Sequence, residues 1–244
     1  MILRRFMQHV KEQNWFAVGL DVVVVIVGIF LGMQVQQWYE DRTEKERIVA
    51  QLDSFRNELM LSLTELNTRR DYYQDRVNGV TELRDRLEND ADLPADDFNR
   101  LLVSSIRGSS LNISFRGYDE LTTTGAMSKV ANENLRDLIH QWDITLTTIE
   151  NMDESIESVR NGHIIPAVIQ SSGFGNAVQS DERYQALTKT KRFEYDIEAI
   201  KADRTFDGTL ALRHVQAQQQ LTFLGDFIDK TNELIVALGD EVVK

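Results

Sequence analysis

One apolar stretch, residues 16–38, constrains the fold of this chain more than any other part of the sequence. It reads FAVGLDVVVVIVGIFLGMQVQQW, and Asp21 is its only charged residue. As a helix with a rise of about 1.5 Å per residue it would be roughly 33 Å long, enough to cross the hydrocarbon core of a bilayer. Trp15 precedes the stretch, and Trp38 and Tyr39 end it, where amphipathic aromatic rings prefer the headgroup level. We therefore predict a transmembrane helix over residues 16–38, with these three aromatic residues as interfacial anchors.

A cleaved secretory signal peptide is the main alternative, because the apolar stretch lies early and follows basic residues. However, the continuation GMQVQQWYED is bulky and polar and contains no small-x-small cleavage site. The apolar stretch is also longer than an ordinary signal core. An uncleaved anchor is therefore the preferred interpretation.

The distribution of charge predicts how this helix is oriented. Residues 1–15 carry a net charge of +2, whereas residues 39–244 carry −13 in a chain with −12 overall. Basic residues that flank a span are retained in the cytoplasm, so we expect the N-terminus inside and residues 39–244 outside. If the source is a Gram-negative bacterium, the anchor lies in the inner membrane and residues 39–244 form a periplasmic domain. Residues 1–15 have helical apolar spacing and are either a cytoplasmic amphipathic helix that contacts membrane lipid or an unstructured start.

Composition excludes several classes of function. The 39 acidic residues outnumber the 27 basic ones, whereas a nucleic-acid-binding surface needs a basic stripe. The chain has no cysteine, which excludes disulfides, thiolate metal sites and thiol nucleophiles. It has two prolines and no long β-branched alternation outside the span, which favours an all-α fold.

Four residues of the span form a predicted interface. Asp21, Gly28 and Gly32 are seven and four residues apart, so they share one face of the helix. A GxxxG pair permits close helix approach, and an ionisable group at membrane depth usually faces a protein interior. We therefore expect Asp21, Gly28, Gly32 and Gln34 to contact a second copy of the chain or another inner-membrane protein. The alternative is that the GxxxG pair arose by chance and that Asp21 is solvated near the cytoplasmic boundary.

The span is expected to continue outward as one long helix, because residues 39–55 are charged and contain neither Gly nor Pro. Apolar residues then recur every seven positions, which is typical of a coiled coil or of one wall of a helical bundle. The acidic segment 90–97 should end this helix. The repeating residues are Leu52, Leu59, Leu66, Tyr73, Val80 and Leu87.

The acidic segment 90–97 does not fit a calcium-binding loop. An EF-hand loop needs a glycine at its sixth position and a glutamate at its twelfth, whereas Pro94 occupies the fifth position here and no glycine follows. Pro94 is better explained as the start of a short helix over residues 95–106. Residues 107–117 are then expected to form a loop.

The rest of the chain predicts further helices. A short helix after Tyr118 should stop at Gly125 in a left-handed conformation, and Asn132 should cap a helix that runs to about Val159. Gly162 and Pro166 should bend or end that helix.

The C-terminal part completes the predicted architecture. A flexible connection over residues 171–180 is followed by a short helix capped by Ser180 and by a last helix over about residues 206–242. The fold class is therefore all-α. A transmembrane helix runs into a long heptad-patterned helix, followed by an antiparallel bundle of about four main helices plus short ones.

Two stretches resemble a family of uncharacterised bacterial single-span membrane proteins. Residues 18–40 are similar to the anchor of that family, with a Gly, an acid, an apolar run containing Val-Gly-Ile, then Gln and Trp; Asp21 stands where relatives more often have Glu. Residues 118–142 are similar to an internal motif of the family. The resemblance implies one N-terminal span and an exported helical domain of unknown function, and it supplies no catalytic residues. The residues of the internal motif are Tyr118, Leu121, Gly125 and Trp142.

The sequence contains no G-x-S-x-G, HExxH, P-loop or dinucleotide-binding motif. A di-metal site in a helical bundle needs two Glu-x-x-His pairs, and the nearest match is Asp137 with His140. His163 and His214 could in principle meet inside the bundle, although such histidines are more often core or interfacial residues than ligands. We therefore expect no metal, no cofactor and no enzymatic activity.

Two classes of function remain. The first is a membrane-anchored interaction or scaffold protein that associates with itself or binds a partner, and a periplasmic ligand or stress sensor is a variant of it. Sensors of that type usually have a second span and a cytoplasmic output, which this sequence lacks. The second is an ion-coupled membrane component in which Asp21 takes up a proton from one side.

Overall fold

The computed structural model describes residues 15–89, 93–108, 113–172 and 196–242, without the side chains of residues 15–19, 21, 171 and 172. These described residues are almost entirely helical and contain no strand, so the expected all-α fold class is confirmed. The chain divides into two compact units, Met1–Ala50 and Gln51–Lys244. The expected amphipathic segment 1–15 (apart from Trp15), most of the connection 171–180 and the helix capped by Ser180 lie outside the described residues.

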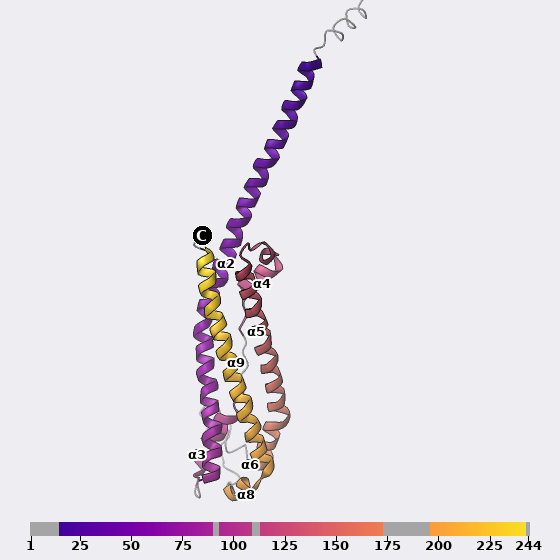
Figure 1. The fold of residues 1–244 in the computed structure, drawn as a ribbon. Coiled ribbons are helices and arrows are strands. Elements are labelled where there is room, and N and C mark those ends of the chain that lie inside the picture. Colours follow the sequence, from indigo (N-terminus) through magenta and orange to yellow (C-terminus); the bar gives the residue numbers. More distant parts are fainter. Residues whose placement is uncertain (1–14, 90–92, 109–112, 173–195, 243–244) are drawn as a thin grey trace, which may run out of the picture. The chain divides into compact units, whose positions relative to one another are not determined.

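Helix α2 (Trp15–Asn89) starts in the first unit and continues without a break into the second, as the sequence predicts (Figure 1). Among the described residues it is the one helix that is long and apolar enough to cross a membrane. An apolar window of this helix has a mean hydropathy of 1.6 and is not buried by the described residues. A membrane anchor is therefore compatible with its length and composition.

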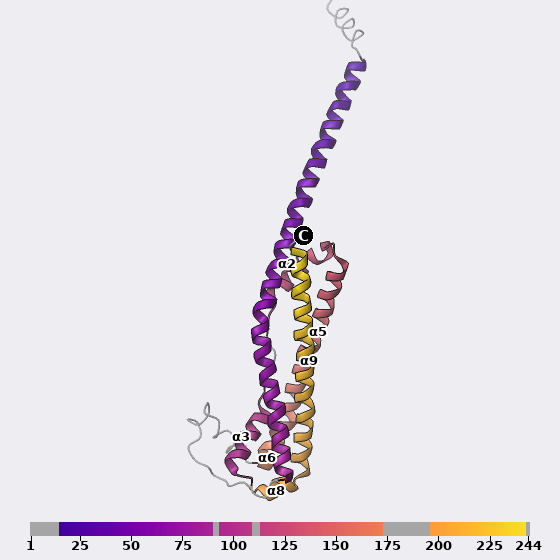
Figure 2. The ribbon, with the colours of Figure 1, turned by 60° about the vertical axis from the view of Figure 1, so that its left-hand side comes forward.

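Unit 2 is built on three long helices: α2 from Gln51 onward, α5 (Glu133–Val159) and α9 (Arg204–Val242). Figures 1 and 2 show that α2 and α5 run in the same direction and that α9 runs antiparallel to both. Short helices join or extend them. These are α3 (Ala95–Ile106), α4 (Arg116–Thr123), the 3-10 turn η1 (Ala126–Lys129), the π-helical turn η2 (Arg160–Ile164), α6 (Ile165–Ser172) and α8 (Ile197–Ala202).

The heptad repeat in α2 faces the core of unit 2, as predicted. Its buried members are at most 1% exposed, and only Leu87 remains partly exposed. A second apolar cluster closes the end of the unit near α3, α8 and the start of α9. Both regions bury the apolar face of each helix, which is the main source of stability for such a bundle. The buried heptad residues are Leu52, Leu59, Leu66, Tyr73 and Val80.

Local sequence signals place most helix ends correctly. Gly125 has a φ of 71° after α4, and the Asn132 side chain accepts a hydrogen bond from the N–H of Leu135 at the start of α5. The expected loop over residues 107–117 is wrong at its end, because α4 already begins at Arg116. Helix α5 ends at Val159, and the π-helical turn η2, which contains Gly162, interrupts the regular α-helix where the sequence predicts a bend or an end. The helical path continues through Pro166 in α6, although a proline ring is incompatible with a regular hydrogen bond to the preceding turn.

Candidate functional site

The apolar surface of α2 between Leu20 and Tyr39 is the first feature with functional meaning. Its large apolar side chains are between 49% and 66% exposed, which a water-soluble surface rarely sustains over such a length. Nothing lies within 4 Å of a Cβ placed on Gly28 or Gly32, so both glycines are open to the close approach of another helix. Gln34, which follows Gly32 near the end of the apolar run, is also exposed.

The predicted aromatic anchors differ in what the structure describes. Trp38 and Tyr39 are 63% and 66% exposed, and the Arg42 guanidinium lies 5.9 Å from the centre of the Trp38 ring. Trp15 and Asp21 belong to α2, but their side chains lie outside the described residues. The expected interface of Asp21, Gly28, Gly32 and Gln34 therefore stays a prediction.

The motif at Tyr118, Leu121, Gly125 and Trp142 folds onto α2 within unit 2. The N-terminus of α4 presents the backbone N–H groups of Arg116 and Gly117, and both donate to the Glu58 carboxylate, at 2.9 Å and 2.8 Å. A Cβ on Gly117 would lie 2.8 Å from the Cα of Phe55, so only glycine allows this close contact. Glu58 also places a negative charge at a helix N-terminus, where it stabilises the helix.

Tyr118 of α4 belongs to a cluster of five aromatic residues that we call the aromatic layer. Its members are Phe55, Phe115, Tyr118, Trp142 and Phe227. Trp142 is fully buried at its centre, with ring centroids of the other four residues 4.8 to 5.5 Å away. Its indole N–H donates to the Thr231 hydroxyl at 3.0 Å, and that hydroxyl donates to the carbonyl of Phe227. The motif that the sequence analysis selected therefore has a packing role in this structure.

Tyr118 is the one partly exposed member of the aromatic layer. Burial, followed by a hydrogen bond and the charge of Asp143 and then the charge of Asp119, raises the pKa of its hydroxyl above the ordinary value. The neutral tyrosine is therefore the form that the fold favours.

A second buried cluster in unit 2, which we call the arginine layer, contains Tyr73, Arg76, Asp153, Gln220 and Arg213. The Asp153 carboxylate, 2% exposed, accepts from the Tyr73 hydroxyl at 3.1 Å and from the Gln220 amide at 2.8 Å. The carbonyl oxygen of Gln220 accepts from Nη1 of Arg76. The Arg76 guanidinium also lies 5.0 Å from the centre of the Tyr73 ring, within range of a cation–π interaction.

Arg213 is the other cation of the arginine layer and is fully buried. Its Nε and Nη2 donate to the backbone carbonyls of Ser105 and Arg107, at 3.0 Å and 2.9 Å. Burial, and then the charge of Arg76, lowers the pKa of Arg213 to about 9. The charge of Arg76 therefore acts on the Arg213 guanidinium.

The π-helical turn η2 starts next to this layer with Arg160. The Arg160 side chain donates to the carbonyl of Ile106 at 3.0 Å and to the Glu157 carboxylate at 2.8 Å. Single π-helical turns occur frequently at functional sites. The arginine layer, Arg160 and η2 together form the strongest candidate site in the described part of the chain.

The three histidines in the described residues do not form a site. His140 and His163 are exposed, and His214 lies 3.3 Å from the Thr81 hydroxyl, so His163 and His214 do not meet inside the bundle. Within the described residues, no group of three or more His, Asp or Glu side chains could hold a metal ion.

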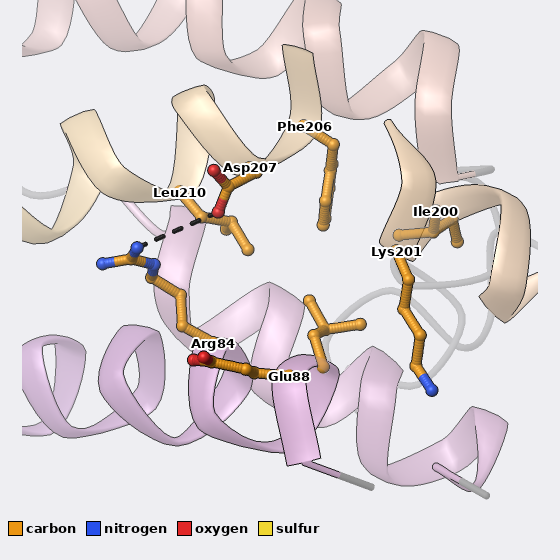
Figure 3. Close-up of a pocket in the computed structure, with 8 residues that line it drawn as sticks. Arg84, Glu88, Ile200, Lys201, Phe206, Asp207 and Leu210 are labelled. Atoms are coloured by element: carbon orange, nitrogen blue, oxygen red, sulfur yellow. Dashed lines mark ion pairs between the residues drawn. The ribbon is translucent and has the colours of Figure 1, made fainter. Parts of the chain in front are cut away.

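One pocket of about 370 Å³ lies where the end of α2 meets α8 and the start of α9 (Figure 3). Its floor is aliphatic and aromatic, and its rim carries charges of both signs. Arg84 extends toward Asp207 with a long separation of 3.9 Å. The rim is largely exposed and carries two positive and two negative side chains. The pocket therefore favours neither anionic nor cationic ligands. The lining residues are Arg84, Leu87, Glu88, Ile200, Lys201, Phe206, Asp207 and Leu210.

A family model of unknown function, DUF6090, matches residues 21–154, which is more than half of the chain. The chain belongs to DUF6090. The match to DUF6090 starts at Asp21 and covers residues 21–40 of the first stretch on which the sequence resemblance rests, all of the second stretch, and Arg76 and Asp153. No curated protein and no solved structure matches the chain. Membership in DUF6090 therefore supports the expectation of an uncharacterised family and assigns no activity.

The arginine layer was not predicted from the sequence. The signal was present, because each charged residue occupies a core position of an apolar repeat. Arg76 lies three residues after Tyr73 and four before Val80, and Asp153 lies four after Ile149 and three before Ile156. Burial along α5 follows the same repeat: Ile139, Leu146 and Asp153 are buried, whereas Leu138, Met152 and Val159 are only half-buried.

Proposed function

We propose that this chain is a membrane-anchored interaction or scaffold protein without enzymatic activity. Its α2 helix would span a bacterial inner membrane with the N-terminus in the cytoplasm, and unit 2 would lie in the periplasm. The observation that carries the proposal is the run of exposed apolar side chains from Leu20 to Tyr39. Burying that run in lipid removes an apolar surface that water would otherwise contact.

Self-association through α2 is the second part of the proposal. Gly28 and Gly32 leave a flat strip on the helix, and a single span can supply Asp21 with a protein environment only by meeting another helix. Chemical crosslinking and mass measurement in nanodiscs would test it. We expect an oligomer that dissociates when Gly28 and Gly32 are both replaced by Leu.

The matched control is Ile26→Leu with Phe30→Leu, because these residues lie on the opposite face of the same helix. The control should keep the oligomer. A monomer in the wild type, or an oligomer unaffected by Gly28→Leu and Gly32→Leu, would contradict self-association through this strip. Recovery of the wild type from the soluble fraction would contradict the anchor itself.

Protease accessibility tests the orientation separately. In spheroplasts, added protease should digest unit 2 while a tag at the N-terminus stays protected. Digestion of unit 2 only after the inner membrane is opened would place it in the cytoplasm and reverse the proposed orientation.

An ion-coupled role for Asp21 is the second candidate, favoured by the position of this one acid inside the apolar stretch. Asp21→Asn keeps the size of the side chain and removes its charge. If Asp21 carries protons, the variant should lose the cellular phenotype of the wild type while its abundance and oligomer stay unchanged. If the oligomer weakens together with the phenotype, Asp21 has a packing role.

A further inference from the structure

We propose that the arginine layer is a binding site for a small oxyanion of the phosphate or carboxylate type, held between Arg76 and Arg213. The first observation is a set of buried donors without acceptors. Nε and Nη2 of Arg76 and Nη1 of Arg213 are shielded from solvent and have no hydrogen-bond acceptor among the described residues. Buried N–H groups of a charged guanidinium are costly to leave unpaired, so an acceptor is expected there.

The other nitrogens of the two side chains fix where the free donors lie. Nη1 of Arg76 is held by Gln220, and Nε and Nη2 of Arg213 are held by the backbone carbonyls of Ser105 and Arg107 at the C-terminal end of α3. Both guanidinium groups are therefore oriented by protein contacts before any ligand arrives. Such preorganised planar donors match the geometry of an oxyanion.

Charge is the second observation. Arg76 and Arg213 are 1% and 0% exposed, and Asp153 is the one carboxylate of the layer that is comparably buried. Asp153 already accepts two hydrogen bonds, from Tyr73 and Gln220. The layer thus holds two positive charges and one negative charge away from water, and the neighbouring Glu157–Arg160 ion pair, which also acts on Arg213, adds no net charge. A monoanion would cancel this excess, whereas a water molecule would only satisfy N–H groups.

Ordered water is the competing occupant. The carbonyl oxygen of Gln216 is also buried without a donor, and it lies on α9 between Arg213 and Gln220. An acceptor of this kind needs water rather than an anion. Water alone in the layer is therefore the outcome that the experiment has to distinguish.

The test uses the full-length protein in nanodiscs and inorganic phosphate as the probe. Thermal unfolding is followed by circular dichroism in chloride and in increasing phosphate at constant ionic strength. We expect Tm to start rising near the Kd of phosphate, to have risen by about 3–6 °C at roughly ten times the Kd, and to continue upward with the logarithm of the phosphate concentration. A parallel titration with formate tests whether a carboxylate has the same effect.

Arg76→Gln and Arg213→Gln should lose the logarithmic rise in Tm. Arg100→Gln is the matched control, because this arginine is exposed on the same unit, and it should behave as the wild type. General salting-out would raise Tm in all variants alike, in proportion to the phosphate concentration. Where a Gln variant does not fold, isothermal titration calorimetry of phosphate into the wild type decides the question. The absence of both the logarithmic rise in Tm and a saturable binding isotherm, or the persistence of the rise in Arg213→Gln, would overturn the proposal and leave water as the occupant.

Discussion

The aromatic layer and the arginine layer are built from the same three helices by opposite means. Around Trp142, α2, α5 and α9 contribute Phe55, Trp142 and Phe227, and the one indole N–H is paired with Thr231. Around Asp153, the same helices contribute Arg76, Asp153 and Gln220, and several guanidinium N–H groups remain unpaired. The first layer gains stability from packing and from the pairing of its indole N–H. The second gives up stability to keep charge in the interior.

This difference indicates a structural role for the aromatic layer and makes the arginine layer the candidate binding site. A layer in which packing and hydrogen bonding are both complete explains why the three helices assemble. A layer that departs from the ordinary rules for buried charge is where a ligand or a specific role is expected. The motif recognised from the sequence, with Tyr118 and Trp142, belongs to the first kind, although it was the more conspicuous of the two.

The largest effect should come from the aromatic layer. Trp142→Ala removes the central ring and its hydrogen bond to Thr231, and we expect a loss of about 3–5 kcal/mol in the free energy of unfolding. Trp38→Ala is the control, because Trp38 is 63% exposed and lies outside unit 2. Chemical denaturation of both variants in nanodiscs measures the difference. Equal unfolding midpoints would show that the aromatic layer does not hold the bundle together.

Removing the buried carboxylate of the arginine layer should cost about 3 kcal/mol. Asp153→Ala leaves the Tyr73 hydroxyl and the Gln220 amide without their acceptor and removes the buried carboxylate of a layer that holds two buried cations. Glu154→Ala, at the next position of α5, is the exposed control and should change stability by about 0.5 kcal/mol or less. If both variants unfold at the wild-type denaturant concentration, the arginine layer is not the charged interior described above.

The same two layers show how much of the fold was readable from the sequence. Apolar periodicity predicted the long helix through Leu52, Leu59 and Leu66 and the extent of α5, because burial repeats with the helical period. Asn132 and Gly125 predicted helix ends, because caps act within one turn of the backbone.

The features that the sequence did not predict have a common physical cause, because they depend on contacts between segments that are distant in the sequence. The start of α4 at Arg116 requires Glu58, and Arg213 at a core position of α9 requires the carbonyls of Ser105 and Arg107. A charged residue in an apolar repeat looks like an interruption of the pattern when its partners lie in another helix. The candidate site could therefore have been suspected from Arg76 and Asp153, but its partners could not have been named.

A smaller effect is expected where α4 contacts α2. Gly117→Ala places a Cβ 2.8 Å from the Cα of Phe55, and backbone atoms cannot move aside as a flexible side chain can. We expect a loss of about 2 kcal/mol from the resulting displacement of α4. Gly208→Ala is the control, because nothing lies within 4 Å of a Cβ there, and alanine should stabilise α9 slightly. A Gly117→Ala variant as stable as the wild type would mean that α4 can shift without loss of packing.

The smallest effect concerns pH and Tyr118. Because the folded state raises the pKa of Tyr118, the native protein keeps this proton at a pH where the unfolded chain has begun to lose it. The resulting stability is present below the unfolded pKa of about 10 and is lost as the pH rises above it. Wild-type stability should therefore fall more steeply with pH in this range than that of Tyr118→Phe. Tyr39→Phe, a change in an exposed tyrosine of unit 1, should follow the wild type. Parallel curves for all three proteins would show that Tyr118 ionises equally in the folded and unfolded states. That result would contradict the effect of burial and of Asp143 on the pKa of Tyr118.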